Sequence, residues 1–134
     1  VEPSAALVIR PHPIADQAAF GCLEDIDSTT RRNGYSGGLR LVLAALKRFR
    51  LMCVNEGLCD PAALKRNFAL EYDTNVPRQV GLAGSSCIVS AIFKAMAGFY
   101  GVTMNLETAP SAVLAAEWEE LGIHAGLMDR VAQL

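Results

Sequence analysis

The feature that most constrains the fold of this chain is a glycine- and serine-rich segment, residues 77–87, with the sequence PRQVGLAGSSC. It lies between a strand-like run and a long apolar helix. Glycines allow positive φ angles and a close approach of the backbone to a ligand, and they leave backbone N–H groups uncovered. A helix that begins there adds its unpaired first-turn donors and the positive end of its dipole. The segment therefore predicts a loop that binds an anion, such as the phosphates of a nucleotide.

Two standard phosphate-binding motifs do not match this loop. The P-loop requires a Lys before its Ser or Thr, and no Lys precedes Ser85. The Gly-x-Gly-x-x-Gly fingerprint of dinucleotide-binding folds does not occur at this turn. A plain helix N-terminus, with Ser at the cap and Gly for the turn, is the alternative interpretation.

Hydrophobic periodicity predicts an α+β fold. Helices are expected from about Ser36 to Asn55, from Ser85 to Tyr100 and from Pro110 to Leu121, and another begins within residues 125–134. Strands are expected at residues 5–9 and 67–73, residues 14–23 fit a short strand or a loop, and the polar residues 27–34 predict turns. This order favours helices packed on one face of a mostly antiparallel sheet. The 134 residues are expected to form a single domain, 1–134.

Composition argues against several partners. Twelve basic and fourteen acidic residues give a net charge of −2 without a block of like charge, so neither nucleic acid nor a membrane surface is expected as a partner. The sequence contains no run of 18 apolar residues, so a transmembrane helix is not expected. The four cysteines lack metal-binding spacing, which predicts free thiols in a reducing compartment, the cytoplasm.

Two longer segments resemble one enzyme family. Residues 72–86, YDTNVPRQVGLAGSS, resemble the second signature of the GHMP kinases, the superfamily of galactokinase, homoserine kinase and mevalonate kinase. Residues 122–133, GIHAGLMDRVAQ, are similar to the segment that carries the catalytic Asp of those enzymes. Residues 7–13 and 34–41 look most like the glucuronokinases, a family of sugar-1-kinases. The resemblance implies an incomplete N-terminal domain with a ribosomal-S5-like fold. It also implies ATP, Mg²⁺ and a sugar as small-molecule partners, with D-glucuronate as the preferred acceptor.

The resemblance also implies roles for individual residues. The metal ligands are Glu117, five residues before Gly122, and a serine of the loop. That serine is Ser85 or Ser86, because this chain reads GLAGSS where relatives commonly read GLGSS or GLSSS. The ATP phosphates are expected to bind the loop residues Gly81, Leu82, Ala83, Gly84, Ser85 and Ser86.

Three further residues are candidates for contact with the acceptor of the phosphate. Asp129 is implied as the catalytic residue that orients or deprotonates the anomeric hydroxyl. Because a carboxylate is a weak base for a sugar hydroxyl, orientation would be its larger share. Arg130 is expected either to bind a substrate carboxylate or phosphate or to form a structural salt bridge. Tyr35 is a weaker candidate for the sugar pocket. Glu119 and Glu120 are expected only to form a solvated helix face.

GHMP kinases also have opening strands and a further glycine-rich signature in a C-terminal domain, neither of which occurs in these 134 residues. We therefore expect the chain alone to be inactive and, through exposed sheet edges, to self-associate. Two alternatives are a GHMP kinase with another acceptor and a non-catalytic binding or assembly module that keeps the fold.

Overall fold

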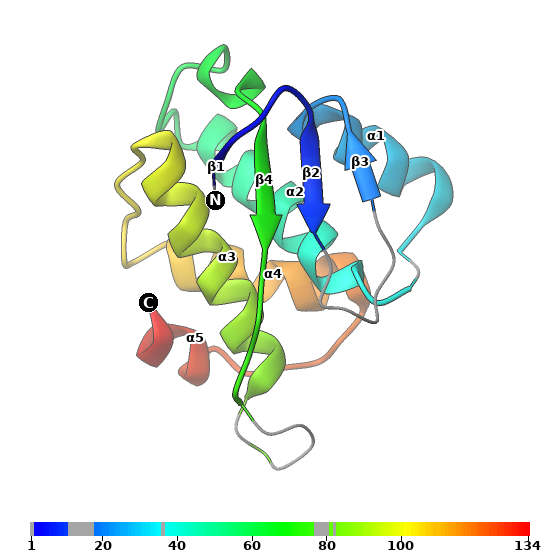
Figure 1. The fold of residues 1–134 in the computed structure, drawn as a ribbon. Coiled ribbons are helices and arrows are strands. Elements are labelled where there is room, and N and C mark those ends of the chain that lie inside the picture. The colour runs from blue at the N-terminus through cyan, green and yellow to red at the C-terminus, as the bar shows by residue number, and fades with distance from the viewer. Residues whose placement is uncertain (1, 11–17, 36, 77–80, 82) are drawn as a thin grey trace.

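The structure, a computed structural model, describes residues 2–10, 18–35, 37–76, 81 and 83–134. Its strands are β1 (Glu2–Pro3), β2 (Leu7–Arg10), β3 (Ala18–Phe20) and β4 (Phe68–Glu71). They form one sheet in the order β1–β4–β2–β3 (Figure 1). β4 pairs in parallel with β2 and antiparallel with β1, and β2 pairs antiparallel with β3. The predicted strands are thus present, and two of the three pairings are antiparallel.

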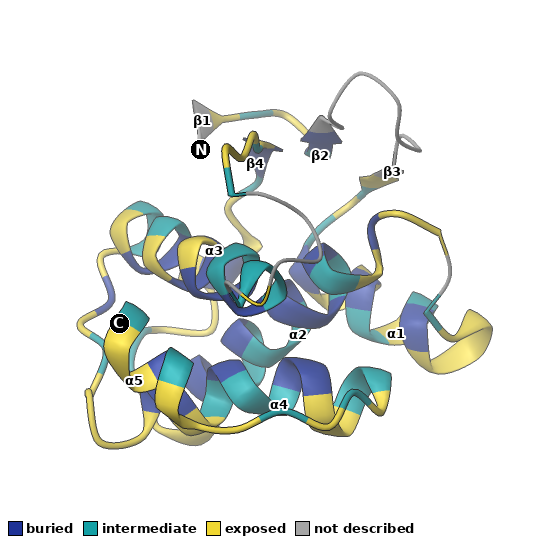
Figure 2. Cartoon of the chain, turned by 90° about the horizontal axis from the view of Figure 1, so that it is seen from below, coloured by how far each residue is buried: buried dark blue, intermediate teal, exposed yellow. Residues whose placement is uncertain are grey.

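Two layers of helices cover one face of this sheet (Figure 2). The layer next to the sheet contains α1 (Leu23–Asn33), α2 (Arg40–Asn55) and α3 (Gly84–Tyr100). The outer layer contains α4 (Ala109–Leu121) and α5 (Met128–Gln133), and a short 3₁₀-helix, η1 (Ala63–Lys65), precedes β4. α2 packs against α1, α3 and α4 and so lies at the centre of the fold. The α+β class predicted from the sequence is confirmed.

The prediction of turns at residues 27–34 is wrong, because α1 continues through this segment to Asn33. Its buried residues Leu23, Ile26 and Thr30 follow the three- and four-residue spacing of an amphipathic helix. The backbone N–H of Cys22 donates to Asp25 Oδ2 at 3.1 Å and caps the helix start. Leu23 and Ile26 precede the polar residues 27–34. The helical periodicity is therefore not visible within that polar segment by itself.

The predicted helices at 85–100 and 110–121 are confirmed to within one residue at their starts. α2 begins at Arg40 rather than near Ser36. Gly37 has a φ angle of 72°, which lies in the left-handed region and is incompatible with an α-helical turn. The helix therefore starts only after this glycine.

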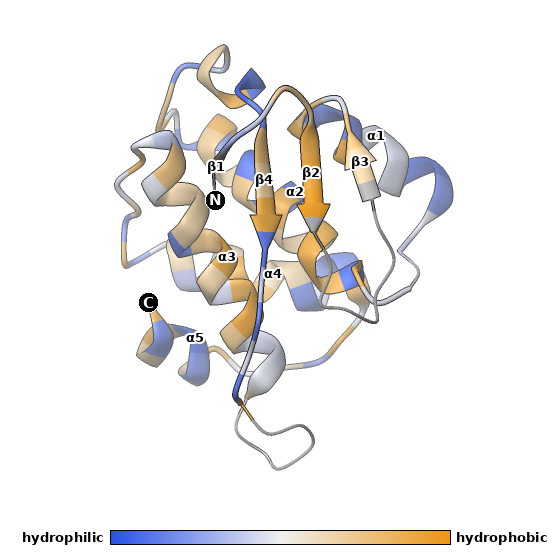
Figure 3. Ribbon diagram, in the orientation of Figure 1, coloured by the Kyte–Doolittle hydropathy of each residue, from blue (hydrophilic) through white to orange (hydrophobic). Residues whose placement is uncertain are grey.

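Apolar side chains from the sheet and from the inner helices form a single core. Hydrophobic residues follow β2 and β4 and the helix faces beneath them (Figure 3). Phe49 of α2 and Phe93 of α3 are fully buried, and their rings meet edge to face at 5.7 Å. Within the described part of the chain, none of the helices is long and apolar enough to cross a bilayer. The core holds α3 in place under β4. On the side of α3 that faces away from the sheet, α3, α4 and α5 pack against one another.

Candidate functional site

The glycine- and serine-rich loop leads into the N-terminus of α3, as the sequence predicts. Gly81 has a φ angle of 75°, and Ala83, the N-cap residue, has φ 51° and ψ 39°. No side-chain hydrogen bond caps this helix start. Ser86 Oγ donates to the carbonyl oxygen of Ala83 at 2.8 Å, which turns that hydroxyl back onto the cap residue. Leu82 and residues 77–80 of the predicted loop lie outside the described residues.

The left-handed conformation of Ala83 makes a testable prediction. An L-residue with a Cβ costs about 1–2 kcal/mol in this region, whereas glycine adopts it readily. We expect Ala83→Gly to stabilise the chain by about 0.5–1 kcal/mol in urea unfolding, after the larger backbone entropy of glycine in the unfolded state is subtracted. The matched control is Ala91→Gly at an exposed interior position of the same helix, which should lose about 1 kcal/mol. A loss of stability in both variants would contradict the left-handed assignment.

A buried carboxylate lies beside the loop. Glu117, on α4, is completely inaccessible to solvent. Ser85 Oγ donates to its Oε1 at 2.6 Å, and Nη2 of the buried Arg130 donates to its Oε2. Arg130 Nη1 also donates to the carbonyl oxygen of Gly126 at 2.7 Å. The ion pair with Glu117 compensates the burial of both charges. It matches the structural salt bridge, which is one of the two expectations for Arg130.

The two serines of the loop have different surroundings. Ser85 contacts the carboxylate of Glu117, whereas Ser86 is fully buried between the carbonyl of Ala83 and the side-chain amide of Gln133. Of the two hydroxyls, Ser85 Oγ is the one within hydrogen-bond distance of the carboxylate of Glu117. The geometry therefore favours Ser85 in the choice that the sequence left open.

Asp129 lies in the first turn of α5, next to this buried group. Its side chain is 47% exposed, and its Oδ2 is 3.6 Å from Arg130 Nη1. The neighbouring carboxylates therefore differ in their surroundings: Glu117 is enclosed and paired, while Asp129 faces solvent at the edge of the same arginine. A solvent-accessible carboxylate is the one that an incoming hydroxyl group can reach.

The donor set fits a magnesium ion. Mg²⁺ prefers hard oxygen ligands at about 2.0–2.1 Å, uses one or two carboxylates, and keeps waters or substrate phosphates on its other positions. Neighbouring ligands of such an octahedral ion are about 2.9 Å apart, close to the 2.6 Å between Ser85 Oγ and Glu117 Oε1. The described residues contain no group of three or more His, Cys, Asp or Glu side chains that would form an all-protein metal site. Ser85 and Glu117 offer one hydroxyl and one carboxylate, a pair that suits an ion which keeps waters and substrate phosphates on its other positions.

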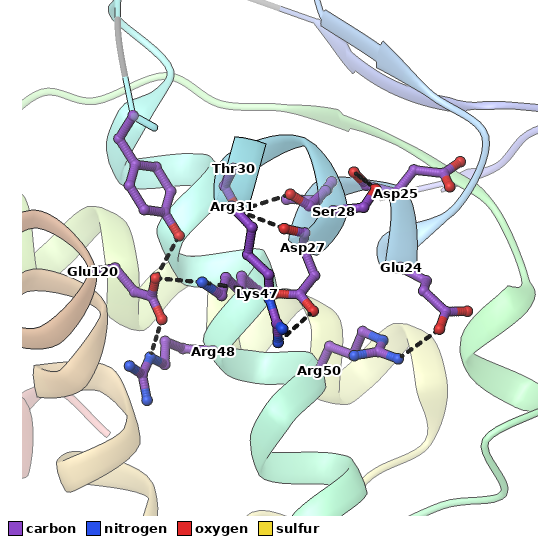
Figure 4. Close-up of polar contacts among 12 residues, drawn as sticks. Glu24, Asp25, Asp27, Ser28, Thr30, Arg31, Lys47, Arg48, Arg50 and Glu120 are labelled. Atoms are coloured by element: carbon purple, nitrogen blue, oxygen red, sulfur yellow. Dashed lines mark hydrogen bonds and ion pairs between the residues drawn. The ribbon is translucent and has the colours of Figure 1, made fainter. Parts of the chain in front are cut away.

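The prediction that Glu120 belongs to a solvated face is wrong. Its side chain is only 7% exposed and accepts hydrogen bonds from Tyr35 Oη and Lys47 Nζ, both at 2.7 Å (Figure 4). Arg48 Nε lies 2.6 Å from its other oxygen. Glu119, in contrast, is 58% exposed and pairs with Arg48. Only α2, which packs under α4, supplies the two cations, so the sequence of α4 alone could not reveal this cluster.

Tyr35 belongs to this cluster and not to the Ser85 group. Burial and its hydrogen bond to Glu120 raise the pKa of the phenol above its ordinary value, so the hydroxyl stays a donor. Its assignment to a sugar pocket stays a prediction. The residues that sequence reasoning missed are Glu120 and Gln133, because the partners of both are remote in sequence.

The Glu120 cluster predicts a pH dependence. Burial alone would raise the pKa of Glu120, but hydrogen bonds from Lys47 and Tyr35 and the charge of Arg48 outweigh it and lower that pKa. A lowered folded-state pKa contributes stability above the unfolded value, near 4.5, that is lost as the pH falls through the folded value. We expect Glu120→Gln to lower the free energy of unfolding by about 2 kcal/mol at pH 7.

The difference between Glu120→Gln and the wild type should shrink as the pH falls below about 4.5. Urea unfolding followed from pH 7 to pH 3 measures this. Glu119→Gln is the matched control because its carboxylate is largely exposed, and its unfolding free energy should follow the wild type throughout. A constant difference for Glu120→Gln across the whole range would contradict the assignment.

A cleft opens beside the loop, between the end of β4 and α3. Its volume is about 610 Å³. One wall is the extended backbone of residues 70–75, and the other consists of the α3 side chains Cys87, Ile88, Ala91, Ile92 and Ala95. The cleft begins one turn from Gly84, so the N-terminus of α3 and this partly apolar wall adjoin.

The fold and the site together define a kinase domain of a known class. A crystal structure of mevalonate kinase superposes with a TM-score of 0.74, covering 97% of this chain and 38% of that chain at 19% sequence identity, which shows the shared fold. Residues 40–134 match the family described as "GHMP kinases N terminal domain". The chain belongs to the GHMP kinase family.

Two relatives from Arabidopsis thaliana make the comparison more specific. "Probable glucuronokinase 2" and "Glucuronokinase 1" are each 46% identical to this chain over 136 aligned residues. The alignments cover 100% of this chain but 36% of each relative. The chain therefore spans about a third of the length of these relatives.

Proposed function

We propose that this chain supplies the phosphate-binding and catalytic residues of an ATP- and Mg²⁺-dependent sugar-1-kinase that acts on D-glucuronate. One observation carries this proposal: Ser85 from α3, Glu117 from α4 and Arg130 from α5 form one hydrogen-bonded group beside Asp129. Residues 32 positions apart in sequence meet here through the fold. The acceptor follows from the names of the two relatives.

Phosphoryl transfer requires mainly positioning and neutralisation of charge. The backbone N–H groups at the start of α3 would bind the phosphate oxygens of ATP, assisted by the helix dipole. Ser85 Oγ and Glu117 Oε1 would hold the magnesium ion, which when bound neutralises charge on the transferred phosphate. Arg130 keeps the carboxylate of Glu117 in one orientation by pairing with its second oxygen.

Asp129 would act on the acceptor. Its exposed carboxylate can accept a hydrogen bond from the anomeric hydroxyl and so direct a lone pair of that oxygen toward the phosphate. The proton of the hydroxyl would pass to a carboxylate oxygen of Asp129 as the new O–P bond forms, while the bond between the γ-phosphorus and the β,γ-bridging oxygen breaks and ADP leaves. We also place the protein in a reducing compartment, the cytoplasm, because its four cysteines, all within the described residues, form no disulfide.

The experiment that tests this function is ATP-dependent phosphorylation of a sugar panel by the protein in its full reading frame. The panel contains D-glucuronate, D-galacturonate, D-glucose and D-galactose, with sugar 1-phosphate detected directly. Preferred turnover of glucuronate supports the proposal. Turnover of another sugar would keep the kinase and change the acceptor. If no sugar reacts and ATP does not bind, the fold serves as a binding module and the proposed function is wrong.

A further inference from the structure

We propose that Gln133 is a positioning residue that fixes α5, and with it Asp129, on the first turns of α3. The inference rests on the proposed function and adds a residue to it. Gln133 Nε2 donates to Ser86 Oγ and to Cys87 Sγ, each at 3.2 Å. Its Oε1 accepts a hydrogen bond from Ser90 Oγ at 3.1 Å. A single side chain thus connects α5 to the helix that begins at the phosphate-binding loop.

α5 needs such a connection because it has little other support. It contains six residues, fewer than two turns, and an isolated helix of that length is not stable in water. Met128 and Val131 are 81% and 59% exposed. Arg130 is the buried residue of the helix, and its ion pair leads to Glu117 on α4. Leu134 at the end of α5 packs against the core, and Gln133 adds a polar attachment that joins α5 to α3.

The geometry relates this attachment directly to Asp129. Residues 129 and 133 are four positions apart, so they occupy the same face of α5 one turn from each other. A displacement of Gln133 from α3 would therefore move Asp129 relative to the helix start that holds the phosphates. Shifts of about 1 Å at a reacting group can lower a rate about 10²-fold.

The amide of glutamine suits this place because it donates and accepts at once. Ser86 Oγ donates to the carbonyl of Ala83, so it needs a donor from the other side, and Ser90 Oγ needs an acceptor. Gln133 provides both. Glutamate would keep the bond from Ser90 but could not donate to Ser86 or Cys87, and alanine would lose all three bonds.

The test compares Gln133→Ala, Gln133→Glu and the control Val131→Ala, an equivalent truncation on the exposed face of the same helix. Steady-state kinetics with glucuronate and ATP use the protein in its full reading frame. We expect Gln133→Ala to lower kcat about tenfold or more, with the KM for ATP changed less than about twofold. Gln133→Glu should lie between Gln133→Ala and the wild type, and Val131→Ala should match the wild type.

Hydrogen exchange provides a second readout that does not depend on turnover. The backbone amides of residues 128–134 should exchange at least about tenfold faster in Gln133→Ala than in Val131→Ala. Adding Ser90→Ala to Gln133→Ala should have little further effect, because the two residues share one bond.

An unchanged kcat, or equal exchange rates in Gln133→Ala and Val131→Ala, would overturn the inference. A wild-type protein that phosphorylates no sugar would instead refute the proposed function, and with it any role for Gln133 in the reaction; the exchange rates would then report only on the attachment of α5.

Discussion

Asp129→Asn is expected to lower the turnover of D-glucuronate about 10³-fold, within the 10²–10⁴-fold range of general acid–base catalysis. The amide of asparagine is nearly the same size as the carboxylate but carries no charge and cannot hold the proton of the anomeric hydroxyl. Because the side chain of Asp129 is 47% exposed, its replacement should change the free energy of unfolding by less than about 0.5 kcal/mol. Steady-state kinetics and urea unfolding of the same preparation separate these two effects.

The control for this prediction is Asp60→Asn. Asp60 is exposed, and its Oδ1 accepts a hydrogen bond from the backbone N–H of Ala62 at 2.8 Å, a bond that the carbonyl of asparagine can keep. The control should retain full turnover. If Asp129→Asn keeps more than about a tenth of wild-type activity, the acceptor must be oriented by another group.

Glu117→Ala is expected to lower the free energy of unfolding by about 3–5 kcal/mol, because it leaves the buried guanidinium of Arg130 without its counter-charge. For a chain of 134 residues this is a large part of the total stability. The same substitution removes the carboxylate that we propose to hold the metal. Urea unfolding measures the loss, and titration with Mn²⁺ in the presence of ATP, followed by electron paramagnetic resonance, measures metal binding.

Two further variants distinguish a lost ion pair from a general perturbation of α4. Glu119→Ala removes a neighbouring, largely exposed carboxylate and should lower the free energy of unfolding by at most about 1 kcal/mol. The double variant Glu117→Leu with Arg130→Met replaces the buried pair with apolar side chains and should recover most of the stability but not the metal binding. Equal losses in Glu117→Ala and Glu119→Ala would show that the buried pair contributes nothing.

The fold could be predicted from the sequence where local pattern and tertiary environment agree. The apolar run that follows the glycine- and serine-rich loop located α3, and the run from Pro110 to Leu121, ended by Gly122, located α4. α1 is not evident in the sequence because its buried residues Leu23 and Ile26 precede the polar segment 27–34, which by itself predicts turns. α2 begins later than predicted because Gly37 adopts a left-handed φ angle, which the helical pattern of the sequence does not reveal.

The candidate site divides in a similar way. Sequence motifs of the family singled out Ser85, Glu117 and Asp129, but they did not decide between Ser85 and Ser86. The position of α4 relative to α3 brings Glu117 against Ser85 and leaves Ser86 facing Gln133, which favours Ser85 in the proposed metal site. Glu120 shows the same limit, because its partners Lys47 and Arg48 come from a helix 72 or more positions away in sequence.

The sequence by itself determined the class of fold, the strand–loop–helix unit and the residue types available for phosphoryl transfer, because these depend on local spacing and backbone preferences. Only the tertiary structure decided which of those residues meet, which carboxylates are buried and paired, and which one faces solvent. The physical reason is that burial and charge pairing depend on distances between helices that are remote in sequence. Arg130 is the clearest case: its role is set by the buried carboxylate that α4 places against it.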